Sequence, residues 1–70
     1  MENMTFVVNM AKVKELTYQK FWSLTELAQQ AHISLATIFA LQAKKRQASK
    51  RTVAKIAAAL DVSPADIIEK

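Results

Sequence analysis

Hydrophobic residues recur at helical spacing along most of the chain, in blocks that each begin at a capping residue. The segment SLTELAQQAHISLATIFAL, from Ser23 to Leu41, contains two such blocks, which open at Ser23 and Ser34. Ser23 and Glu26 match the S-x-x-E capping box, in which each side chain accepts a hydrogen bond from the other residue's backbone N–H. The pattern therefore predicts helices over 24–31 and 35–42, joined by a short turn.

Three further blocks complete a prediction of five helices. Asn9 is placed to cap a helix over 10–20, and Ser49 precedes an apolar stripe at i, i+3, i+4 and i+7 that ends at Leu60. Ser63 and Pro64 provide a cap and a first-position proline for a fifth helix. Two short helices joined by a tight turn form a helix-turn-helix, whose second helix can enter the major groove of DNA.

The N-terminal residues 1–9 differ from the rest. Residues 5–8, TFVV, are aromatic and β-branched, which favours a short strand. A strand needs a partner, and one solution is pairing with the same strand of a second copy, which would make a dimer. The alternatives are an extended arm over the core or an early start of the first helix. We expect an arm or strand over 1–9 and a helix-turn-helix domain over 10–70.

Composition excludes several classes of function. The 70 residues include no cysteine, no glycine and one histidine. Disulfides, thiolate metal sites, glycine-rich phosphate loops and EF-hands are thereby excluded. No apolar run is long enough to span a membrane, and the N-terminus does not resemble a secretory signal. We expect a cytoplasmic, non-enzymatic domain that needs no cofactor and no metal.

Charge is distributed unevenly along the chain, whose net charge is +4. No acidic residue occurs between Glu26 and Asp61, whereas six basic residues fall in that interval. A surface of one sign next to a candidate recognition helix favours phosphate binding. The alternative is a solvated basic loop that serves solubility.

Four successive segments resemble the Cro/Xre-type helix-turn-helix of phage repressors and small bacterial regulators: ELAQQAHIS with LATIFAL, then AKKRQAS, KRTVAKIAAAL and DVSPADII. The resemblance covers about residues 13–70 and implies an all-α, five-helix, lambda-repressor-like fold. That family usually places glycine after three of its helices, where this chain has His32, Lys44 and Asp61. Helices commonly end in a left-handed residue, which glycine adopts without steric cost.

The resemblance also implies which residues meet DNA bases. These are residues on the exposed face of helix 35–42, with Thr37 at its edge as a hydrogen-bond donor: Leu35, Ala36, Thr37, Phe39 and Ala40. Bases are usually read by Arg, Lys, Asn and Gln, whereas this face offers mainly van der Waals contact, chiefly with thymine methyls. Specificity would then depend on those methyls and on DNA shape. Alternatively, Leu35 and Phe39 cover a protein surface.

Phosphate contacts are expected from the loop after this helix, from the start of the next helix and from nearby polar side chains. The free N–H groups at a helix N-terminus favour an anion. Ser49 is also a plain helix cap, and solvent exposure explains Thr25 equally well. The expected residues are Thr25, Gln42, Lys44, Lys45, Arg46, Gln47, Ser49 and Lys50.

These expectations define a leading function and alternatives. The leading one is a homodimeric regulator of transcription, a repressor, that binds a pseudo-palindromic site in double-stranded DNA with two recognition helices ~34 Å apart. The principal alternative is a protein-interaction module of the same fold, an antitoxin or antirepressor. A general RNA or nucleoid binder is a third, although the chain lacks the aromatic platforms that stack single strands.

Overall fold

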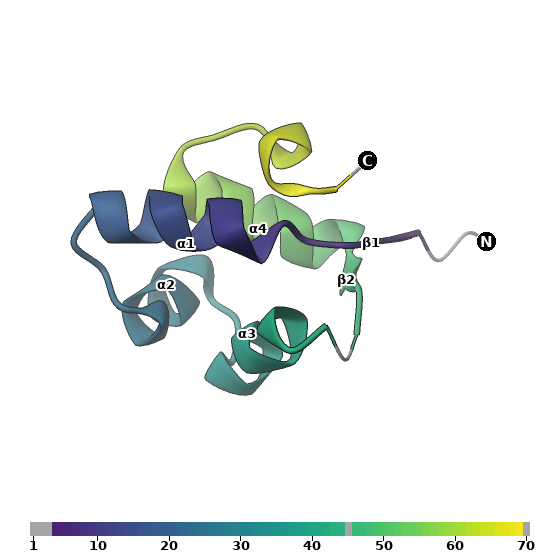
Figure 1. Cartoon of the computed structure of the whole chain (residues 1–70), viewed down its shortest axis with the longest axis horizontal. Helices are drawn as coiled ribbons and strands as arrows, with labels where there is room; N and C mark the ends of the chain where they lie inside the picture. Colours follow the sequence, from purple (N-terminus) through teal and green to yellow (C-terminus); the bar gives the residue numbers. More distant parts are fainter. Residues whose placement is uncertain (1–3, 45, 70) are drawn as a thin grey trace.

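The computed structural model describes residues 4–44 and 46–69. Two short strands and four α-helices are described, followed by one 3₁₀ helix. In Figure 1, α2 and α3 lie together on one side of α1 and α4, and η1 covers the opposite side of α4. In chain order the elements are β1 (Thr5–Phe6), α1 (Met10–Gln19), α2 (Leu24–Ala31), α3 (Leu35–Gln42), β2 (Ala48–Ser49), α4 (Lys50–Leu60) and η1 (Pro64–Ile67).

Side-chain caps fix where the α-helices begin, as the sequence predicts. In each helix the side-chain oxygen of the cap accepts from the backbone N–H three residues later, which satisfies one of the donors that a helix start leaves unpaired. These distances are 3.1 to 3.2 Å. The caps of α1, α2, α3 and α4 are Asn9, Ser23, Ser34 and Ser49 respectively.

The predicted capping box at the start of α2 is only half formed. Ser23 Oγ accepts from the Glu26 N–H, but the Glu26 carboxylate accepts from Gln30 Nε2 at 2.9 Å. Gln30 lies one turn further along the helix, where an i, i+4 side-chain pair is favourable. At the start of η1 the return bond is present, because Ser63 N donates to Asp66 Oδ2 at 3.1 Å.

The prediction of five α-helices is wrong in its last element. Within residues 4–44 and 46–69 there are four, because the segment opened by Ser63 and Pro64 forms only the four-residue 3₁₀ helix η1. The chain then becomes extended at Ile68, which forms an antiparallel bridge with Val8. Pairing with the N-terminal segment thus replaces continuation of the helix.

The N-terminal strand finds its partners within the same chain. β1 pairs antiparallel with β2, with Thr5 opposite Ser49 and Phe6 opposite Ala48. The segment after β1 bonds to the C-terminal residues, with Glu69 N donating to the Val7 carbonyl oxygen at 2.8 Å. The strand therefore finds backbone hydrogen-bond partners without a second copy of the chain. The first helix begins at Met10, as predicted, and does not start early.

In the part of the chain that the structure describes, four residues other than glycine adopt left-handed backbone angles. His32, Lys44 and Asp61, which occupy the expected glycine positions, have φ of 59°, 59° and 60°. Phe21 also has φ of 59°, although the sequence did not predict it. At the end of α1 the Trp22 N–H donates to the Thr17 carbonyl oxygen at 3.2 Å, a bond typical of the Schellman helix ending.

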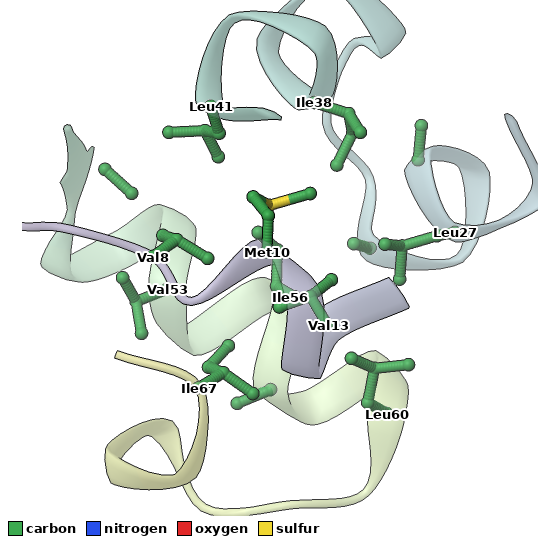
Figure 2. Close-up of a cluster of buried hydrophobic side chains, with 14 residues drawn as sticks. Val8, Met10, Val13, Leu27, Ile38, Leu41, Val53, Ile56, Leu60 and Ile67 are labelled. Carbon is green, nitrogen blue, oxygen red and sulfur yellow. The ribbon is translucent and has the colours of Figure 1, made fainter. Parts of the chain in front are cut away.

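The core gathers apolar residues from every helix and from the N-terminal segment. Figure 2 shows Ile38 and Leu41 directed from α3 toward a cluster that includes Met10 and Leu27. The α4 stripe packs as its spacing predicts, and Ile67 closes the core from η1 with no exposed surface. Burial of both α3 residues fixes which face of α3 remains outside.

Candidate nucleic-acid interface

The turn between α2 and α3 combines a left-handed residue, a backbone hydrogen bond and a residue packed on the core. α2 ends with His32 in the left-handed region, and the Ile33 N–H donates to the Ala28 carbonyl oxygen at 3.0 Å. Ile33 packs against the core, and Ser34 caps α3 immediately afterwards. No glycine is needed for this turn, since a single residue takes the left-handed conformation.

The outer face of α3 is apolar. Ile38 and Leu41 are buried at 0% and 3% exposure, whereas Phe39 remains 51% exposed. Ala36 is exposed beside it, and Ala40 is half-buried. α3 itself lies on the side of the molecule opposite η1 (Figure 1).

Leu35 and Thr37 lie at the margins of that face, both half-buried. Leu35 packs against the core. The Thr37 hydroxyl lies 2.8 Å from Ser34 Oγ, and Ser34 Oγ accepts from the Thr37 N–H at 3.1 Å. Either hydroxyl can donate in this pair, so the structure connects the Thr37 hydroxyl to the helix cap without fixing where its proton points.

The loop after α3 brings three of the expected phosphate-binding side chains together. Lys44, Arg46 and Gln47 line a hollow of about 340 Å³, together with Val7, Val8 and Leu41. All three polar residues are exposed. Lys45, which was also predicted to contact phosphate, lies outside the described residues.

A hydrogen bond from β1 orients one of these side chains. Thr5 Oγ1 donates to Gln47 Oε1 over 2.6 Å. Because the amide oxygen is thus engaged, the Gln47 Nε2 group is left as the donor that can meet an anion. The N-terminal segment therefore helps to shape this loop.

The remaining expected residues lie at helix ends. Thr25 is exposed in the first turn of α2, and Gln42 is exposed at the end of α3. Ser49 and Lys50 are exposed at the start of α4, where Ser49 Oγ accepts from the Thr52 N–H at 3.2 Å. The structure thus assigns Ser49 its role as a cap, and Lys50 places a cation close to the free N–H groups of α4.

An acidic residue near the C-terminus lies beside the loop that follows α3 and contains Lys44 and Arg46. The Glu69 carboxylate lies 3.9 Å from Lys44 Nζ. The sequence did not predict this pair, because it depends on the bridge between Val8 and Ile68 that brings Glu69 to the loop. No local pattern around Glu69 indicates that bridge.

Two other features were sought in the described part of the chain: a metal site and a membrane-spanning helix. No group of three or more histidine, aspartate or glutamate side chains is arranged to hold a metal ion among residues 4–44 and 46–69. The helices described here are all too short or too polar to cross a bilayer.

Comparison with known proteins agrees with this geometry. No curated protein and no solved structure matches the chain significantly. A family model described as a Cro/C1-type HTH DNA-binding domain matches residues 12–69, which include α2, the turn, α3 and the basic loop. Since the match spans most of the 70 residues, the chain belongs to the family of Cro/C1-type helix-turn-helix DNA-binding domains.

Proposed function

We propose that this protein is a sequence-specific regulator of transcription that inserts α3 into the major groove of double-stranded DNA and represses by occluding a promoter. The observation that carries the proposal is the burial of Ile38 and Leu41, which leaves the outer face of α3 exposed, in a helix that exposed cations follow directly in the chain. Residues 35–37, 39 and 40 face the bases in this arrangement, and the phosphates meet the loop.

Phosphate binding in this proposal is supported by the cluster of Lys44, Arg46 and Gln47 around one hollow. Lys50 lies at the N-terminus of α4, where the helix dipole also favours an anion. Thr25 and Gln42 are exposed at the ends of the two motif helices, and Lys45 and Ser49 complete the expected set. These contacts supply affinity and register but no sequence information.

A homodimer is part of the proposal. An apolar hollow of about 300 Å³ lies between the N-terminal segment, α4 and η1, and a second copy would cover it. It is lined by six apolar residues and by Lys50: Met4, Phe6, Lys50, Val53, Ala54, Pro64 and Ile68. A two-fold dimer matches a pseudo-palindromic site, with half-sites ~34 Å apart.

The principal test is selection of binding sites from a random duplex library at about 150 mM salt, close to physiological ionic strength. An enriched pseudo-palindrome is the expected result, together with an affinity that falls linearly with salt on logarithmic axes. Low-salt binding without enrichment contradicts sequence-specific recognition.

The alternative function, a protein-interaction module such as an antitoxin or antirepressor, is favoured by one observation. Phe39 is an exposed aromatic residue on an apolar helix face, and exposed apolar patches mark protein interfaces. Association with a protein partner through this face would be largely insensitive to salt, which separates the two functions experimentally.

A further inference from the structure

The outward side of α3 has no side chain that can form a hydrogen bond with a base. Successive helical residues are about 100° apart, so the direction opposite to Ile38 and Leu41 is occupied by Ala36, Phe39 and Ala40. Two of these side chains are single methyl groups and the third is a phenyl ring. The face is therefore restricted to apolar contact.

Polar neighbours do not change this restriction. Thr37 lies at the edge of the face and is half-buried, and its Oγ1 shares a hydrogen bond of 2.8 Å with Ser34 Oγ in which either hydroxyl can donate. Gln42 lies in the last turn of α3, seven residues after Leu35 and so above it on the helix, next to the basic loop. Its position is suited to the DNA backbone rather than to the centre of the groove.

The major groove offers such a face one apolar feature, the C5-methyl group of thymine. The remaining groups on the base edges are hydrogen-bond donors and acceptors, which need polar partners to be distinguished. 5-Methylcytosine carries a methyl group on the same carbon, at the same place in the groove. An apolar face contacts the methyl group in the same way on either base.

We propose that α3 recognises pyrimidine C5-methyl groups, through Ala36, Phe39 and Ala40, so that 5-methylcytosine substitutes for thymine in its binding site. This inference rests on the proposed function, because it presumes that α3 enters the major groove. Where a G·C pair stands at a position that α3 contacts, methylation of the cytosine C5 should therefore strengthen binding.

The charges that follow α3 in the chain favour DNA as the occupant of this face. Lys44 and Arg46 are exposed in the loop after α3, and Lys50 is exposed at the first position of α4. Their attraction to phosphates holds the helix against the groove without selecting a sequence. Selection is then left to the apolar contacts, each of which is weak by itself.

The test uses the duplex enriched by binding-site selection, with one base changed at a time. Replacing a contacted thymine with deoxyuridine removes only the methyl group and should weaken binding about fourfold per position, the value of one buried methyl group. A G·5-methylcytosine pair at that position should bind within about twofold of A·T, whereas a G·C pair should bind as weakly as the deoxyuridine duplex.

Protein variants assign the effect to α3. With Phe39→Ala, the penalty for deoxyuridine at the position contacted by this residue should disappear. Phe21→Ala is the matched control, since it also removes an exposed aromatic ring but lies between α1 and α2. It should retain the full penalty.

Two results would overturn the inference while leaving the proposed function intact. The first is salt-dependent, sequence-specific binding that is unaffected by deoxyuridine, and the second is a G·5-methylcytosine pair that behaves like G·C. If no duplex is enriched, or if association is insensitive to salt and directed at a protein, both the proposed function and the inference fail.

Discussion

Lys44 Nζ lies 3.9 Å from the Glu69 carboxylate, and this pair connects the loop after α3 to the C-terminal segment. Glu69 is held there by its backbone N–H, which donates to the Val7 carbonyl oxygen at 2.8 Å. A carboxylate therefore sits beside the cations that we propose for phosphate binding. Its negative charge opposes DNA and also competes for Lys44.

Glu69→Gln should increase affinity for every duplex by about twofold to fivefold at low salt, since an exposed charge pair is worth roughly 0.2–1 kcal/mol. The gain should be equal for specific and random sequences, because phosphate attraction carries no sequence information. Fluorescence anisotropy with both kinds of duplex measures it. Glu15→Gln changes the net charge equally on the exposed side of α1 and is the control. Equal gains from the two variants would show that overall charge, not Glu69 itself, is responsible.

Arg46→Ala and Lys50→Ala should each weaken binding to all sequences and reduce the salt slope by about 0.9 for the lost phosphate contact. Both side chains are exposed, so the fold should survive the changes. Affinities measured at several salt concentrations provide the slopes. Lys12→Ala removes the same charge at an exposed position of α1 and should leave the salt slope unchanged. An unchanged slope for Arg46→Ala would remove this residue from the interface.

The sequence predicts the parts of the fold that depend on local signals. The first residue of α1, α2, α3 and α4 follows from a cap and from apolar spacing, both of which are read within a few positions. The division of α3 into a buried and an outer face follows in the same way, as Ile38 and Phe39 illustrate. His32, Lys44 and Asp61 take left-handed angles at the three positions where the related family usually has glycine, although this conformation is less expected of lysine than of the other two.

Features that depend on contacts between distant segments were not predictable from local pattern. The bridge between Val8 and Ile68 follows the shortened last helix, and the pairing of β1 with β2 gives the N-terminal strand a partner within the chain. The bridge at Ile68 carries Glu69 into a region that appeared free of acidic residues. The left-handed conformation of Phe21 was not predicted, because a bulky aromatic residue is among the least expected at positive φ.

Thr17 is a buried polar residue, with no exposed surface, and its Oγ1 donates to the Val13 carbonyl oxygen at 2.7 Å. Thr17→Val should change stability by no more than about 1 kcal/mol, because the gain from a buried methyl group offsets the lost hydrogen bond. Thr17→Ala should cost about 1–2 kcal/mol, since it also leaves a cavity. Urea denaturation compares them. If the valine variant is as unstable as the alanine variant, the hydroxyl itself is required.

Phe21 combines a left-handed backbone with a side chain that is 97% exposed. The left-handed conformation costs a residue with a Cβ atom roughly 1–2 kcal/mol, and this side chain has little packing to offset it. Phe21→Gly should therefore stabilise the protein by about 1 kcal/mol, after the greater flexibility of glycine in the unfolded chain is subtracted. For a domain of this size that corresponds to about 4–8 °C in the melting temperature.

Two further substitutions at this position separate backbone strain from the removal of an exposed ring. Phe21→Ala removes the ring but keeps the Cβ atom, so its melting temperature should stay close to that of the unmodified protein. Phe21→Asn should fall between alanine and glycine, because asparagine tolerates the left-handed region better than most residues. Thermal unfolding followed by circular dichroism gives the order. Equal stabilisation by alanine and glycine would assign the cost to the exposed ring instead, and no stabilisation by glycine would mean that the α1–α2 turn carries no strain at Phe21.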